Sequence, residues 1–274
     1  MSYQADLARW FAQLHGGDQP LLLPNPWDAG SARLLATLGF QALATTSSGF
    51  AATLGRLDGS VTRDEALAHA GALAAATDLP VSADLENGFA DDPDAVAQTV
   101  RDALSAGLVG CSIEDFTGDE SGPIYCLEHA VARIAAAAEA AHDGPVHLVL
   151  TARAENHIHG VDDLEDTITR LRAYGEAGAD VLFAPGLRRA QDIRRVVEEV
   201  APRPLNVLAL PGAPDVAQLA QLGVKRISVG GAFAFTAVEA VAEAARELRD
   251  DGTFGFLERA RAGSARARQA FAAG

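Results

Sequence analysis

The feature that most constrains the fold is an alternation of short apolar runs with longer, alanine-rich amphipathic stretches. Short apolar runs bounded by turn residues indicate buried strands, and the longer stretches have helical periodicity. The expected strands lie at 21–25, 42–47, 81–86, 110–115, 147–154, 181–185, 205–210 and 226–229, and the expected helices at about 28–38, 63–77, 93–106, 127–142, 162–177, 189–200, 214–222 and 232–249. Eight strands, each followed by a helix, predict an α/β protein with the architecture of a (β/α)8 TIM barrel.

The barrel accounts for most of the chain. Thr62 and Glu65 have the spacing of a helix capping box, which supports a helix start at this point. The segments before residue 21 and after residue 251 are expected to form extra N- and C-terminal helices. The chain shows no linker, so residues 1–274 are interpreted as one domain. The helices from about residue 232 are expected to cover the barrel or to pack on a partner subunit.

Composition and charge exclude several classes of function. The net charge of −15 disfavours binding to nucleic acid, because a basic surface is missing. The sequence has no uninterrupted apolar stretch of membrane-spanning length, and its first residues do not resemble a secretory signal. We therefore expect a cytoplasmic protein without a membrane partner. Its two cysteines, Cys111 and Cys126, predict neither a disulfide framework nor a zinc site.

The chain contains a single lysine, Lys225. It precedes the expected strand at 226–229, whereas barrel enzymes place catalytic residues after their strands. Schiff-base chemistry needs a lysine in the active site. The position of Lys225 therefore argues against Schiff-base aldolase and pyridoxal chemistry.

Three acids follow two neighbouring expected strands. Asp84 and Glu86 end one strand and Glu114 ends the next. Because strand side chains alternate between faces, Asp84 and Glu86 are expected to point the same way. Converging carboxylates repel one another unless a cation lies among them, and Mg²⁺ prefers oxygen ligands and keeps several waters. The sequence predicts a Mg²⁺ site here; the alternative is that these acids cap the following helices.

Other strand ends supply groups that can bind a small anion. Ser47, Ser48 and Gly49 offer hydroxyl and N–H groups to a carboxylate or phosphoryl group, although an ordinary turn would have the same composition. Arg153 can hold a carboxylate or stabilise an enolate, and its alternative role is a salt bridge to Glu155 or Glu114. The remaining substrate-binding candidates are Trp27, as an apolar wall, and Asn206.

Several of these segments together resemble the isocitrate lyase and phosphoenolpyruvate mutase superfamily. The matching segments are Asn25-Pro-Trp-Asp-Ala29, Thr45–Gly49, Leu57-Asp-Gly59, Ala83-Asp-Leu-Glu-Asn-Gly88, Ser112-Ile-Glu-Asp115 and Thr151-Ala-Arg-Ala-Glu155. The resemblance implies a (β/α)8 barrel and a Mg²⁺ site that could also accept Mn²⁺. It implies metal ligation by Asp58, Asp84, Glu86 and Glu114, and anion binding by Ser48, Gly49 and Arg153. The catalytic candidates are Arg153, Glu114 and Asp58. It also implies oligomers, dimers or tetramers, that often exchange a C-terminal helix.

The loop at 116–125 departs from that superfamily. Its lyases carry a Lys-Cys-Gly-His-type motif there and its phosphonomutases a lysine and an asparagine, and this loop has neither. Two glycines in the loop could serve as hinges of a lid. Cys126, His157 and His159 are alternative proton carriers, although a structural role is as reasonable for each. The identity of the general acid or base therefore stays open.

Three hypotheses follow for function. The leading one is a Mg²⁺-dependent lyase that cleaves a carbon–carbon bond in a small 2-oxo or 2-hydroxy carboxylate, or decarboxylates it, through an enolate. The second is a phosphoenolpyruvate or carboxyphosphonoenolpyruvate phosphonomutase that acts on a P–C bond. The third is a barrel that binds an oxo acid without turnover. All three predict a small anionic partner, and the resemblance implies a homo-oligomer.

Overall fold

The computed structural model of the protein describes residues 3–272 and confirms the predicted barrel. All neighbouring strands are parallel, in the order β1-β8-β7-β6-β5-β4-β3-β2. The strands are β1 Leu21–Leu23, β2 Leu43–Ala44, β3 Val81–Asp84, β4 Gly110–Glu114, β5 Val149–Arg153, β6 Val181–Phe183, β7 Leu205–Leu208 and β8 Arg226–Ser228. Between β1 and β2 the Ala44 N–H donates to Pro24 O at 3.1 Å, which nearly closes the barrel.

A helix follows each strand, as predicted. The helices are α1 Tyr3–Leu14, α2 Ala29–Ala36, α3 Ser47–Thr53, α4 Arg63–Ala74, α5 Pro93–Ser105, α6 Leu127–His142, α7 Leu164–Glu176, α8 Ala190–Val200, α9 Val216–Gln221, α10 Ala232–Arg246 and α11 Phe256–Phe271, with a π-helical turn η1 Glu247–Asp251 after α10. The predicted extra helices are α1 and α11. None of the helices within residues 3–272 has the length and apolar character needed to cross a membrane.

The strands are shorter than predicted, and α3 was not expected. The expected strand at 42–47 ends at Ala44, because Thr46 already has an N-cap role. Its hydroxyl oxygen accepts a hydrogen bond from the Gly49 N–H at 3.3 Å. Ser47 and Ser48 therefore lie in the first turn of a helix and not at the end of a strand.

The lower end of the barrel is closed by apolar packing. Phe11 of α1 is fully buried among Leu21, Val149 and Val181, which come from the first residues of their strands. The outward faces of the strands form a second, larger core with α2 and α4–α9. The carboxyl ends of the strands lie at the other end of the barrel from the apolar cluster around Phe11, and they can form a site there.

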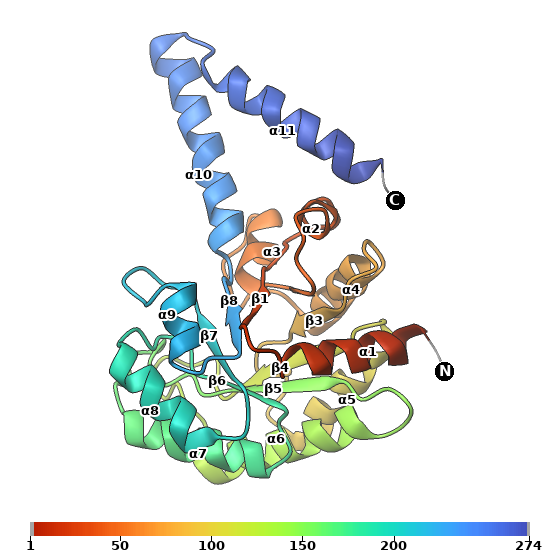
Figure 1. Ribbon diagram of the computed structural model, residues 1–274, viewed down its shortest axis with the longest axis vertical. Coiled ribbons are helices and arrows are strands. Elements are labelled where there is room, and N and C mark those ends of the chain that lie inside the picture. The colour runs from red at the N-terminus through yellow and green to blue at the C-terminus, as the bar shows by residue number, and fades with distance from the viewer. Residues whose placement is uncertain (1–2, 273–274) are drawn as a thin grey trace.

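The last two helices extend beyond the barrel. Figure 1 shows α10 rising away from β8 and α11 turning back toward α2, with which it is in contact. Much of the apolar surface of both helices is exposed to solvent.

Candidate active site

A pocket of about 270 Å³ lies within the barrel toward the carboxyl ends of its strands. In (β/α)8 barrels this end carries the active site, because the loops that follow the strands meet there. The residues that line it include Asn25, Thr45, Ser47, Ser48, Asp58, Ser82, Asp84, Ser112, Arg153, Phe183, Arg226 and Ser228. Most of these side chains are polar, and they come from both halves of the barrel.

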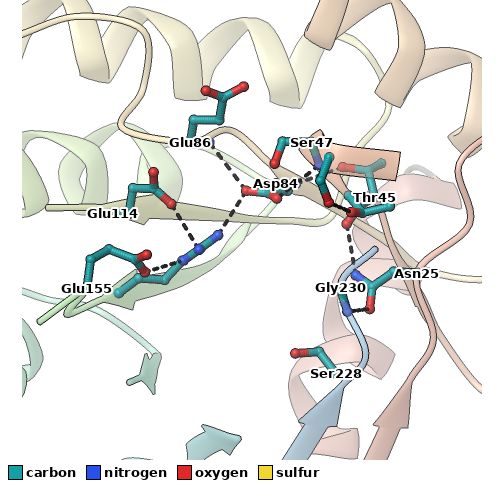
Figure 2. A network of polar contacts seen from close by, with 12 residues as sticks. Asn25, Thr45, Ser47, Asp84, Glu86, Glu114, Glu155, Ser228 and Gly230 are labelled. Carbon is teal, nitrogen blue, oxygen red and sulfur yellow. Dashed lines mark hydrogen bonds and ion pairs between the residues drawn. The ribbon is translucent and has the colours of Figure 1, made fainter. Parts of the chain in front are cut away.

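Arg153 lines the pocket and joins three carboxylates, of which only Asp84 also lines it. Its Nη1 lies 3.0 Å from Asp84 Oδ1, its Nη2 3.0 Å from Glu114 Oε2, and its Nε 2.8 Å from Glu155 Oε1 (Figure 2). None of the four side chains is more than 16% exposed. Both ion pairs given above as the alternative role of Arg153 are therefore formed. Burial raises the pKa of Glu114 well above its usual value, although the charge of Arg153 opposes the shift.

Two further acids add negative charge beside Asp84. Burial, followed by the charges of Asp84 and Asp58, raises the pKa of Glu86 to about 7. Burial also raises the pKa of Asp58, and a hydrogen bond from Ser47 partly offsets that shift. The Ser47 N–H in turn donates to Asp84 Oδ2 at 3.2 Å. One guanidinium group thus faces an excess of acids, which favours a bound cation.

The structure corrects the reason given for pairing Asp84 with Glu86. The strand was expected to reach Glu86 but ends at Asp84, so side-chain alternation does not connect the two residues. Glu86 has a left-handed backbone with a φ of 48°. In Figure 2 its carboxylate points away from Asp84. Glu86 therefore belongs to the turn that follows β3, and it joins the other acids of the site from that turn and not from the strand.

The four acids fit one kind of metal ion better than others. Asp58, Asp84, Glu86 and Glu114 offer only carboxylate oxygens, which are hard ligands. Among residues 3–272, three ligand atoms come within 4.8 Å of one another only in a histidine and aspartate cluster at the opposite end of the barrel. The four acids therefore do not form a closed cage. They suit Mg²⁺, which keeps most of its waters and needs few protein ligands.

The predicted anion-binding residues divide into two groups. Ser47 and Ser48 line the pocket, whereas Gly49 does not. A Cβ at Gly49 would lie 2.6 Å from Thr46 Cγ2 and 3.3 Å from Ala234 Cβ. The absence of a side chain at Gly49 thus allows α3 to pack closely on α10, and its N–H already bonds Thr46.

Trp27 and Asn206 are also outside the pocket wall. The Trp27 carbonyl oxygen lies 2.9 Å from His69 Nε2, so this segment is tied to α4. Asn206 is fully buried behind the wall, where its Nδ2 donates to Ser228 Oγ at 3.0 Å and its Oδ1 accepts from Arg226 Nε at 2.9 Å. Both residues position their neighbours in the folded protein.

Sequence reasoning missed Arg226 and Ser228 as site residues and gave Asn25 no role. Asn25 joins three strands: its Nδ2 donates to Thr45 O at 2.9 Å, and its Oδ1 accepts the N–H groups of Val229 and Gly230, also at 2.9 Å (Figure 2). The signal for Arg226 and Ser228 was present in the sequence. Polar residues two apart on a strand share one face, which here is the barrel interior.

The loop at 116–125 folds back on itself. Phe116 and Ile124 form an antiparallel bridge, and the Phe116 ring stacks on His159 with centroids 3.8 Å apart. His159 Nε2 lies 3.8 Å from Glu155 Oε2, so the loop is linked to the Arg153 cluster through one histidine. Cys126 is exposed at the N-cap of α6, and its side chain makes no capping hydrogen bond.

Fold and site together define the class: a (β/α)8 barrel with a polar pocket and an arginine that pairs with three carboxylates at the carboxyl ends of its strands. The chain belongs to the phosphoenolpyruvate phosphomutase family, whose sequence model matches residues 11–249. This confirms the resemblance found in the sequence.

Solved structures and relatives agree with this assignment. A protein from Burkholderia cenocepacia J2315, described provisionally as a lyase/mutase, is 52% identical with a TM-score of 0.91, and the match covers 93% of this chain and 92% of that one. A 2,3-dimethylmalate lyase, described as a PEP mutase/isocitrate lyase superfamily member, is 29% identical with a TM-score of 0.82 over 91% and 89% of the two chains. An oxaloacetate decarboxylase from Pseudomonas paraeruginosa is 31% identical over 81% of this chain and 78% of its own length.

Proposed function

We propose that the protein is a Mg²⁺-dependent lyase that cleaves a carbon–carbon bond in a small 2-oxo or 2-hydroxy carboxylate, or decarboxylates it, through an enolate. The observation that carries the proposal is the contact of Arg153 with both Asp84 and Glu114, at a pocket that Arg153 lines together with Ser47 and Ser48. Two of the relatives are named as a decarboxylase and a lyase, and both names denote cleavage of a carbon–carbon bond in a small acid.

The residues suggest a division of roles. Ser47 and Ser48 would donate hydrogen bonds to a substrate carboxylate. Arg153 would stabilise the negative charge that develops on an enolate oxygen, because a fixed cation in a buried site requires little reorganisation. Glu155 holds Arg153 Nε at 2.8 Å and so orients the guanidinium group. Glu114 Oε2 lies 3.0 Å from Arg153 Nη2 and holds another edge of the same guanidinium group.

A bound Mg²⁺ would add Lewis-acid stabilisation of the same negative oxygen. It would be held by Asp84, Glu86, Glu114 and Asp58, directly or through water. Three carboxylates surround the single guanidinium group of Arg153, and this local excess of acids supports the assignment.

The proposal is tested by Mg²⁺-dependent release of pyruvate or glyoxylate from a panel of 2-oxo and 2-hydroxy acids. We expect release by the wild-type protein and a loss of at least about 100-fold in Glu114→Ala, because a charge-stabilising group is removed. Exposed Glu139 near the end of α6 is the matched control, since Glu139→Ala removes the same charge at the opposite end of the barrel. Tight binding of oxo acids without any product would contradict the lyase and favour a non-catalytic binder.

A phosphonomutase is the second candidate, because the matching family is described as a phosphoenolpyruvate phosphomutase. The position of the single lysine weighs against it. Lys225 Nζ bonds Gly17 O at 2.9 Å, before β8 and at the amino ends of the strands, so it cannot help to neutralise a transferring phosphoryl group. A phosphonate signal in phosphorus NMR after incubation with phosphoenolpyruvate would favour the mutase.

A further inference from the structure

Arg226 is a buried cation with no acidic partner among residues 3–272. It opens β8, faces the barrel interior and is only 4% exposed. Its Nε donates to the neutral Asn206 Oδ1 at 2.9 Å, and its Nη1 has no hydrogen-bond partner among the described residues. Burial, followed by the positive charge of Arg153, lowers the pKa of Arg226 to about 9.

The titratable neighbour on the other side supplies no negative charge either. His15 lies near Arg226, and burial together with the charge of Arg226 lowers its pKa to about 4, so it is neutral at physiological pH. An unpaired buried ion is strongly unfavourable relative to its exposed state. The fold therefore holds Arg226 in an unfavourable position, which points to a partner that is absent from the chain itself.

The surroundings of Arg226 suit an anion. Arg226 lines the same pocket as Asp84 and Arg153, together with the hydroxyl groups of Ser82, Ser112 and Ser228. Ser228 Oγ accepts a hydrogen bond from Asn206, so its own proton is available to a ligand. The interior of a (β/α)8 barrel is usually filled by bulky branched side chains. Small hydroxyl residues at these positions leave room above Arg226.

We propose that Arg226 forms a second anion-binding site at the lower end of the pocket, and that it receives a carboxylate of the substrate other than the one bound by Ser47 and Ser48. The substrate would then be a short dicarboxylate. A pocket of about 270 Å³ is smaller than the roughly 300–1,000 Å³ typical of drug-sized ligands and suits such an acid. This inference rests on the proposed function, because it extends the same site.

The fate of the carboxylate at Arg226 follows from charge. In a decarboxylation the bond to the carboxylate breaks, its electron pair stays on the remaining carbon as an enolate, and the departing group becomes neutral CO2. An ion pair between this carboxylate and Arg226 would weaken as the carboxylate loses its charge in the transition state. An interaction that is stronger in the ground state than in the transition state slows the reaction. The carboxylate at Arg226 is therefore retained, and a different carbon–carbon bond is cleaved.

Binding of two matched acids tests the proposal. Malate and lactate are both 2-hydroxy acids, and only malate has a second carboxylate. In titration calorimetry with Mg²⁺ present, the wild-type protein should bind malate at least about 10-fold more tightly than lactate, the effect of one charged hydrogen-bond pair. Arg226→Gln should reduce this ratio to about one. Arg101→Gln, which removes an exposed arginine on α5, should leave it unchanged.

A second variant covers the case in which Arg226→Gln fails to fold. Asn206→Asp places a carboxylate beside Arg226 Nε, where the amide oxygen now lies at 2.9 Å. The new internal ion pair should raise the melting temperature and also reduce the malate-to-lactate ratio. A wild-type protein that binds both acids equally or fails to bind malate, or a ratio that survives in both variants, would overturn the proposal. The turnover screen tests the proposed function separately. If the protein binds malate more tightly than lactate but releases no product, the lyase is contradicted and the anion site at Arg226 is not.

Discussion

At the scale of single residues, Gly49 shows how closely the elements near the site are packed. Replacing it with alanine would force a Cβ to within 2.6 Å of Thr46 Cγ2 and 3.2 Å of Trp27 Cβ. Overpacking of this kind costs about 1–3 kcal/mol, which exceeds the roughly 1 kcal/mol that alanine gains over glycine in a helix. We expect Gly49→Ala to lower the melting temperature by a few degrees in calorimetry.

Gly263 in α11 is the matched control. No heavy atom beyond its own helix and its chain neighbours lies within 4 Å of a Cβ built there, so Gly263→Ala should be neutral or slightly stabilising. Equal effects of the two substitutions would show that packing between α3 and α10 does not explain Gly49.

The sequence named the acids of the site but not their partners. Asp84, Glu114 and Arg153 could be selected because they are polar residues at the ends of apolar runs. Whether Arg153 contacts substrate or pairs with those acids depends on distances between β3, β4 and β5, which no spacing within the chain encodes. Arg226 was missed for a related reason: its meaning lies in the absence of an acid nearby, and only the assembled barrel shows that absence.

At the scale of elements, a cluster at the amino ends of the strands joins α6, β5 and β6. Asp180 Oδ2 lies 3.0 Å from His142 Nε2 and accepts the Leu150 N–H at 2.8 Å, and Asp180 Oδ1 lies 3.1 Å from His147 Nε2. The hydrogen bond to Asp180 raises the pKa of His147 above its usual value. Although burial opposes the shift, hydrogen bonds from both histidines lower the pKa of Asp180.

These shifts predict a pH-dependent contribution to stability. The raised pKa of His147 stabilises the fold below about pH 6.5, and this contribution is lost as pH rises through the folded-state value. The lowered pKa of Asp180 contributes above about pH 4 and is lost in stronger acid. The pair is therefore strongest between these limits. We expect His147→Gln to cost up to about 1 kcal/mol at pH 5.5 and less at pH 8.5, because the pair is partly exposed.

Chemical denaturation at the two pH values, with a chelator present, measures this difference. Glutamine can keep a hydrogen bond to Asp180 but cannot become charged, so it isolates the ionic part. His129→Gln, in the first turn of α6 and outside the cluster, is the control. A penalty for His147→Gln that is the same at both pH values would contradict the ion pair.

The elements were predictable because each strand and helix carries its own signal. The buried runs and the capping box at Thr62 specify their elements locally, and the structure has a helix after every strand. Helix α3 was not predictable in this way. Its seven residues, from Ser47 to Thr53, are too few for a periodic pattern, and the helix is fixed by the Thr46 cap and by contact with α10.

At the scale of the whole molecule, the C-terminal arm formed by α10, η1 and α11 exposes more apolar surface than a monomer would be expected to leave in water. Phe235, Val241 and Phe254 are 50%, 70% and 61% exposed. Large apolar side chains exposed along two neighbouring helices indicate an interaction site. Figure 1 shows that the arm projects from the barrel, so a second copy could reach both helices. This arrangement supports the expectation that the C-terminal helices pack on a partner subunit.

We therefore expect the protein to form a dimer, or a tetramer of such dimers, through this arm. Val241→Asp should weaken self-association at least about 30-fold, because a charge would be buried at the centre of the contact. Sedimentation velocity over a range of concentrations measures the change. Val216→Asp, at the start of α9, adds the same charge at another exposed valine and should leave association unchanged. A wild-type protein that is monomeric at about 100 μM, well above the Kd expected of a stable interface, would contradict association through the arm.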